Sequence, residues 1–150
     1  MSGSAIRHDS ETIHHDHELL LQRLAGLDAA LEALVCESEV YADLASSADV
    51  LGAGRWLCAW LPEHFEREEQ TLAAVARLGP DWAVFSREMV RQHRAISERL
   101  RGFCQIAAEL EQTADLERSI CDLKQSGKQF TSMMTAHMSA EERKLRSLGA

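Results

Sequence analysis

Apolar residues recur every three or four positions along most of the chain, which is the spacing of one face of an α-helix. The longest stripe, near the C-terminus, contains Leu116, Ile120, Leu123, Gly127, Phe130, Met134, His137, Glu141, Leu145 and Leu148. Three earlier segments carry similar stripes. The pattern predicts four amphipathic helices, at about residues 10–39, 50–78, 82–111 and 116–148.

Short polar segments separate the predicted helices. Residues 1 to about 9 form a polar lead, and residues 46–49 predict a turn with an N-cap. Gly79 and Pro80 end one helix and begin the next, with Asp81 as a capping residue, and residues 112–115 form the last turn. Connections this short make consecutive helices antiparallel. We therefore predict an all-α fold, an up-down-up-down antiparallel four-helix bundle, as a single domain over residues 1–150.

Length and composition agree with this fold and exclude some functions. The chain has 150 residues, enough for one domain with a core, and only two prolines and eight glycines, which favours helices. Pro62 lies inside the second predicted helix and is expected to kink it. A net charge of −8 without a basic run argues against nucleic-acid and membrane surfaces. No apolar stretch approaches the roughly 20 residues of a membrane span, so we expect a soluble cytoplasmic protein.

The four cysteines are widely spaced. Cys36, Cys58, Cys104 and Cys121 form no Cys-x-x-Cys pair, so zinc-ribbon spacing is absent. Each falls within a helical pattern. We predict reduced cysteines that act as small apolar packing residues.

Histidines and glutamates interrupt the apolar stripes at positions where leucine is expected. The histidines are His17, His64, His93 and His137, one in each predicted helix, and Glu68 and Glu141 follow the second and fourth of them by four residues. Residues four apart share one helix face, so these polar groups point into the core. A single His-x-x-x-Glu is commonly a surface pair, but two in phase with apolar stripes favour a buried metal site.

The positions of the histidines along the helices allow them to meet. Since neighbouring helices run in opposite directions, all four fall in the same half of the bundle. Four imidazoles and two carboxylates exceed the four ligands of a structural zinc. Two metals bridged by carboxylates fit better, with iron favoured over manganese or zinc. His8, His14 and His15 are expected to lie outside this set, and His14 is nearest to it in phase.

Four segments, residues 13–20, 64–69, 92–96 and 137–142, resemble the hemerythrins and hemerythrin-like HHE domains, and the resemblance spans nearly the whole chain. The His-Phe-x-x-Glu-Glu element is its most specific part. The resemblance implies a non-haem centre of two Fe ions with an oxo or hydroxo bridge, bridged also by Glu68 and by a carboxylate of the fourth helix. The predicted ligands are His17, His64, Glu68, His93, His137 and, from the fourth helix, Glu141.

The chain departs from the classical family pattern at two positions. Oxygen-carrying hemerythrins have a second histidine four residues before the third-helix ligand, where this chain has Met89. A thioether is a poor ligand for ferric iron, so an open iron position is expected, although Met89 also suits a flexible core residue. The last classical carboxylate follows its histidine by five residues, which is Glu142. A four-residue step turns only about 40° from the histidine and a five-residue step about 140°, which favours Glu141 and leaves Glu142 as the alternative.

The implied function is binding of O2, NO or H2O2 at the open iron, for sensing or for removal of peroxide or nitric oxide. Whether the chain is an enzyme stays open at this point, since only consumption of peroxide or nitric oxide would make it one. An alternative is an iron storage or delivery module without turnover. A third is a structural bundle whose inward histidines are satisfied by hydrogen bonds.

Overall fold

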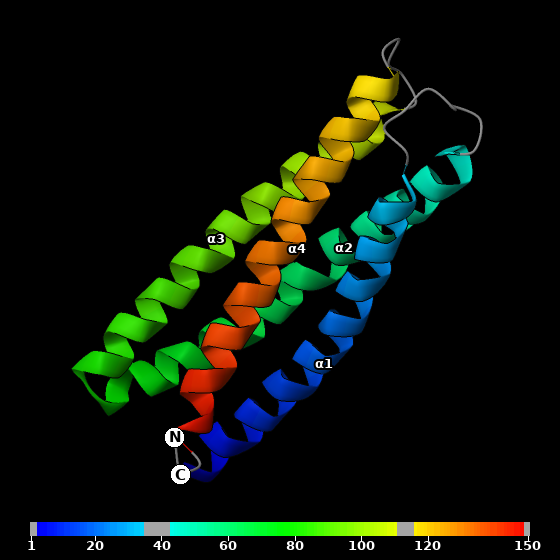
Figure 1. Cartoon of the computed structure of the whole chain (residues 1–150). Coiled ribbons are helices and arrows are strands. Elements are labelled where there is room, and N and C mark those ends of the chain that lie inside the picture. Colours follow the sequence, from blue (N-terminus) through cyan, green and yellow to red (C-terminus); the bar gives the residue numbers. More distant parts are fainter. Residues whose placement is uncertain (1–2, 35–42, 111–115, 149–150) are drawn as a thin grey trace.

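The computed structural model describes residues 3–34, 43–110 and 116–148. Within these ranges the chain forms the helices α1 (Gly3–Ala33), α2 (Asp43–Val75), α3 (Pro80–Glu109) and α4 (Leu116–Arg146), with the short 3-10 helix η1 (Ala76–Leu78) before α3. Each long helix packs against the next, and α1 packs against α4. Consecutive helices run in opposite directions, and α1 starts at the end of the bundle where α4 finishes (Figure 1). The predicted four-helix bundle is confirmed.

Two predicted boundaries are wrong. α1 begins at Gly3 and not after residue 9, and residues 46–49 lie inside α2 and form no turn. Serine and aspartate favour caps because their side chains compete for backbone hydrogen bonds, but a helix tolerates them where the side chain faces solvent. Asp49 is such an exposed residue. The predicted turn at residues 112–115 and the predicted end of the first helix lie outside the described residues.

The junction between η1 and α3 has the expected glycine and proline. Gly79 has a φ of 157°, which side chains disfavour, and Pro80 occupies the first turn of α3. Asp81 also lies in that first turn and is not the capping residue. In the first turn, its negative charge faces the positive end of the helix dipole. α2 continues through Pro62, since the helix extends on both sides of it.

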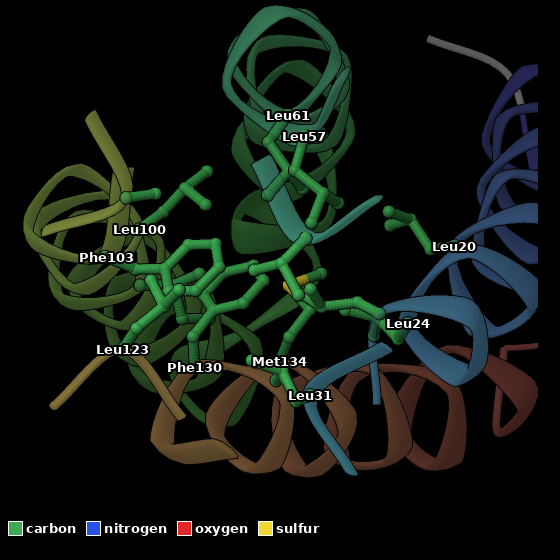
Figure 2. Packing of buried hydrophobic residues seen from close by; sticks show 14 of the residues in the cluster. Leu20, Leu24, Leu31, Leu57, Leu61, Leu100, Phe103, Leu123, Phe130 and Met134 are labelled. Carbon is green, nitrogen blue, oxygen red and sulfur yellow. The ribbon is translucent and has the colours of Figure 1, made fainter. Parts of the chain in front are cut away.

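Two apolar clusters fill the bundle. The larger one brings together leucines and aromatic rings from all four helices; Leu24, Leu31, Leu57, Leu100, Phe103, Phe130 and Met134 are among its members (Figure 2). The smaller one is centred on Leu72, Val75 and Met89. The inward polar residues lie between the two clusters along the helices, so water is excluded on both sides of them.

The outward faces of the helices are polar, as the amphipathic pattern predicts. Among the residues whose burial is described, the exposed large hydrophobic side chains are Leu21, Leu78 and Val84. Among the helices of the described ranges, none has an apolar stretch long enough to cross a membrane.

The cysteine prediction is wrong for one pair. Cys58 of α2 and Cys104 of α3 form a disulfide between neighbouring helices. The two residues are 46 positions apart, so only the packing of α2 on α3 brings them together, and no spacing rule reveals it. Cys121 takes no part in this bond, and Cys36 lies outside the described residues.

Gly127 of α4 lies where side chains of neighbouring helices pack closely against its backbone. A Cβ atom added there would lie 2.6 Å from Cδ1 of Leu31 and 3.0 Å from Cε2 of Phe103, and both side chains are fully buried. We expect Gly127→Ala to lower the free energy of unfolding by about 1–3 kcal/mol through overpacking. Urea denaturation measures the change.

Gly26→Ala is the matched control, because it lies inside α1 and a Cβ added there meets nothing within 4 Å. It should raise the free energy of unfolding by about 0.5–1 kcal/mol, the usual gain of alanine over glycine in a helix. Similar effects of the two substitutions would contradict close packing at Gly127.

Candidate metal centre

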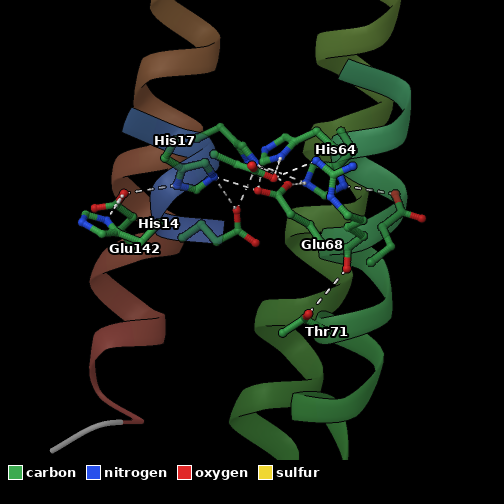
Figure 3. Close-up of polar contacts among 12 residues, drawn as sticks. His14, His17, His64, Glu68, Thr71 and Glu142 are labelled. Atoms are coloured by element: carbon green, nitrogen blue, oxygen red, sulfur yellow. Dashed lines mark hydrogen bonds and ion pairs between the residues drawn. The ribbon is translucent and has the colours of Figure 1, made fainter. Parts of the chain in front are cut away.

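The six residues predicted as ligands come together in the interior of the bundle. They are His17 of α1, His64 and Glu68 of α2, His93 of α3, and His137 and Glu141 of α4, and none is more than 2% exposed. The side chains of His17, His64 and Glu68 point toward one another between the helices (Figure 3). They form two groups, each with ligand atoms within 4.8 Å of one another: one contains His17, His64 and Glu68, and the other Glu68, His93, His137 and Glu141.

Glu68 belongs to both groups because its two oxygens face different histidines. Oε1 lies 2.7 Å from Nε2 of His17 and 2.7 Å from Nε2 of His64. Oε2 lies 3.1 Å from Nε2 of His93 and 4.0 Å from Nε2 of His137. The carboxylate therefore lies between two histidine pairs, which is the position of a bridging ligand.

Glu141 is the second carboxylate between the pairs. Its Oε2 lies 3.6 Å from Nε2 of His17 and 3.6 Å from Nε2 of His137, one histidine from each pair. Glu142 points away from this interior: its Oε1 lies 3.0 Å from Nδ1 of His14 and 3.3 Å from Nδ1 of His17. The structure thus places Glu141 inside and Glu142 outside, as the helix phase predicts.

The outer nitrogen of each inward histidine has an acceptor on a neighbouring helix. The Nδ1 contacts are with Glu142 for His17 (3.3 Å), Asp16 for His64 (3.2 Å), Glu69 for His93 (3.1 Å) and the amide oxygen of Gln92 for His137 (3.0 Å). Nδ1–H donates in these hydrogen bonds, which directs Nε2 of each histidine into the interior. Such contacts orient metal-binding histidines in proteins.

The sequence did not identify these acceptors, but it contains a signal for them. Asp16, Glu69, Gln92 and Glu142 each lie directly beside an inward residue of their own helix. A side chain one position away lies on the flank of the helix and reaches the next helix. A polar residue directly beside a predicted ligand is the sequence pattern that could have indicated these hydrogen-bond acceptors.

The interior contains buried polar atoms without hydrogen-bond partners. Nε2 of His93 and Nε2 of His137 lie 3.1 Å apart and face each other. Nε2 of His64, Oε2 of Glu68 and both carboxylate oxygens of Glu141 are buried without a hydrogen-bond partner. Each such group costs about 1–3 kcal/mol, and more when it is charged. Metal cations satisfy all of them at once, so the donor set fits bound metal.

The two interior carboxylates differ in pKa. Burial alone would raise the pKa of Glu68, but hydrogen bonds from the four inward histidines outweigh it and hold the pKa well below its ordinary value. Burial, followed by the negative charge of Glu68, raises the pKa of Glu141 well above its ordinary value. Burial also lowers the pKa of His137. Without metal, Glu68 therefore stays ionised to lower pH than an ordinary glutamate, and Glu141 keeps its proton to higher pH.

Met89 does not take the place of a ligand. It is 3% exposed and packs with Leu72 and Val75 in the smaller apolar cluster, one helical turn from His93. On the other side of His93, the ring of Phe65 stacks on the imidazole at 4.1 Å between centroids. His93 thus lies between apolar groups, with its two nitrogens directed at Glu69 and the interior.

The comparison with protein families agrees with this geometry. A family model described as the hemerythrin HHE cation-binding domain matches residues 8–148. The chain therefore belongs to the hemerythrin HHE family, which binds metal ions. Comparisons with curated proteins and with solved structures gave no match.

Metal binding should release a proton from Glu141. Its raised pKa means that the metal-free protein keeps this proton to higher pH than an ordinary carboxyl, and a metal that binds in that range must displace it. Affinity should therefore rise with pH for as long as Glu141 is protonated. Calorimetric titration of metal-free protein in two buffers of different ionisation enthalpy measures the proton release. Glu141→Gln should reduce it, and an unchanged release would contradict the assignment of the proton to Glu141.

The outer hydrogen bonds should contribute to metal affinity. Asp16→Ala removes the acceptor of His64 Nδ1, and loss of such a contact typically weakens metal binding by about 10–100-fold. Competition with a coloured chelator measures the affinity. Asp28→Ala, on the same helix but paired with Lys128 and Thr131 away from the site, should leave it unchanged. Equal affinities in the two variants would show that the Asp16 contact is incidental.

Proposed function

We propose that this chain is a non-haem di-iron protein that binds O2, NO or H2O2 at an open iron position and acts in sensing or detoxification. The observation that carries the proposal is the buried arrangement of two carboxylates between two histidine pairs, with Nε2 of each histidine directed inward. Membership of the hemerythrin HHE family supports metal binding. The number and identity of the metals, and the small ligand, are the parts that we propose.

Two metals fit this donor set better than one. Glu68 offers one oxygen to each histidine pair, and Glu141 lies between the same pairs. Imidazole and carboxylate ligands together suit iron. His17 and His64 would hold one ion, His93 and His137 would hold the other, and Glu68 and Glu141 would contribute carboxylates to both.

The proposed open position lies at the ion held by His93 and His137. Met89 occupies the position from which classical hemerythrins supply a further histidine, and its thioether packs in an apolar cluster. When bound, the iron pair supplies a Lewis-acidic, redox-active position for a diatomic or peroxide ligand. The protein's own residues hold the ions, keep Glu68 ionised and exclude bulk water with the two apolar clusters.

A groove beside His93 supports an approach for small ligands. It has a volume of about 370 Å³ between α2 and α3, and its lining includes Pro62, Phe65, Glu69, His93 and Arg94. Phe65 and His93 are buried residues of this lining, so the groove reaches residues at the proposed centre. Consumption of peroxide or nitric oxide at this centre would make the chain an enzyme. The cytoplasmic location is a separate prediction.

Metal analysis of protein purified without added metal tests the proposal. We expect two irons per chain and an absorption spectrum of bridged ferric iron that changes on addition of peroxide or nitric oxide. Zinc with a silent spectrum, or less than one metal per chain, would overturn the di-iron proposal. Iron that a mild chelator removes, with no spectral response to either ligand, would favour storage or delivery.

Met89→His tests the open position. The imidazole restores the ligand found in classical hemerythrins, so we expect the reaction of the ferrous protein with peroxide to slow. Stopped-flow absorption measures the rate. Met89→Leu keeps the position apolar and should react like the wild type; equal rates in all three proteins would remove Met89 from the proposed mechanism.

A further inference from the structure

Three aromatic rings of α2 form a stack that begins at an inward histidine. The indole of Trp60 lies 4.8 Å from the imidazole of His64 with an interplanar angle of 21°, and the indole of Trp56 lies 5.3 Å from that of Trp60 at 15°. The residues are spaced by four, so their side chains follow one face of the helix. Both indoles are partly exposed, whereas His64 is fully buried. The stack therefore leads from solvent to the candidate metal centre.

The other aromatic contacts of the described residues make no such path. Phe65 stacks on His93, but its ring is only 5% exposed. Trp82 meets Phe85 edge-on at 86°, and its described ring contacts include no inward histidine. The stack of His64, Trp60 and Trp56 is thus distinguished by both its parallel rings and its partly exposed end.

Positive charge lies over both indoles of the stack. The guanidinium of Arg23 is 4.7 Å from the ring centroid of Trp56, and that of Arg67 is 5.8 Å from that of Trp60. A cation over the ring face attracts its π electrons and makes removal of an electron from the indole harder. The rings are therefore suited to act as a bridge between a donor and the metals, without being oxidised themselves. The exposed Arg23 also favours an anionic donor at the outer end.

We propose that the stack of Trp56, Trp60 and His64 is the route by which electrons from an anionic donor, such as a reduced flavin bearing a phosphate, reach the metal centre. The inference rests on the proposed di-iron function. Reduction of H2O2 to two water molecules takes two protons and two electrons, and it converts two ferrous ions to ferric ions. The reverse conversion takes two electrons, which a reduced flavin anion supplies as it becomes oxidised flavin and releases one proton.

Stacked rings are suited to this transfer because the rate of electron tunnelling falls steeply with the width of each non-bonded gap. Parallel rings in contact leave two short gaps between the surface and His64. The substitution Trp60→Leu would replace the indole ring next to His64 with a smaller aliphatic group. It would therefore widen both gaps. Phenylalanine would retain a ring in the stack.

Reduction kinetics test the route. The iron-loaded protein is oxidised with peroxide, freed of excess oxidant and mixed anaerobically with reduced flavin mononucleotide, while the loss of the ferric absorption is followed. We expect Trp60→Leu and Trp56→Leu to slow the reduction several-fold and Trp60→Phe to remain near the wild-type rate. Trp82→Leu is the matched control, because it removes a partly buried indole that also has a cation, Lys144, over its ring, and it should leave the rate unchanged.

Two further measurements separate this inference from the proposed function. Iron content and the rate of oxidation of the ferrous protein by peroxide are measured for each variant, and in Trp60→Leu the reduction rate should fall more than the oxidation rate. Equal reduction rates per iron in Trp60→Leu, Trp56→Leu and wild type would overturn the route while the di-iron function stands. Failure of the wild type to bind iron or react with peroxide would overturn both. If Trp60→Leu loses iron, Trp56→Leu still tests the route, because Trp56 has no described contact with a proposed metal ligand.

Discussion

The structure depends on the meeting of four imidazoles and two carboxylates in a dry interior. Burial of these groups is costly, and several of their atoms have no hydrogen-bond partner, so cations between them would stabilise the arrangement. The apolar clusters on either side exclude water from the site. Burial raises the pKa of Glu141, whereas contacts with four histidines outweigh the effect of burial on Glu68 and lower its pKa.

The outer hydrogen bonds link the site to the packing of the whole bundle. Asp16 of α1 contacts a histidine of α2, Glu69 of α2 one of α3, Gln92 of α3 one of α4, and Glu142 of α4 one of α1. The contacts form a closed ring around the bundle. Each helix therefore supplies an inward histidine and also orients that of its neighbour. A shift of any helix along its axis disturbs two members of the ring, so helix packing and site geometry are set together.

The two histidine pairs have different surroundings. The proposed binding of small ligands involves one pair, and the proposed transfer of electrons involves the other. His93 lies beside Phe65 and the groove between α2 and α3, and Met89 stands one turn away. His64 lies at the inner end of the tryptophan stack, with Asp16 and Arg67 beside it. Small ligands and electrons would then reach the centre from different faces of the bundle, so a bound ligand need not block the transfer of electrons.

The sequence by itself determined the four helices, their inward faces and the six polar residues on those faces. This was possible because a helix repeats every 3.6 residues, so His137 and Glu141 share a face with Phe130 and Met134 whatever surrounds them. Only the tertiary structure decided the partners of each Nδ1, the disulfide between Cys58 and Cys104 and the close contact of Gly127 with Leu31. These contacts join different helices, and they depend on the rotation and axial position of one helix against another, which a periodic pattern along a single helix does not contain.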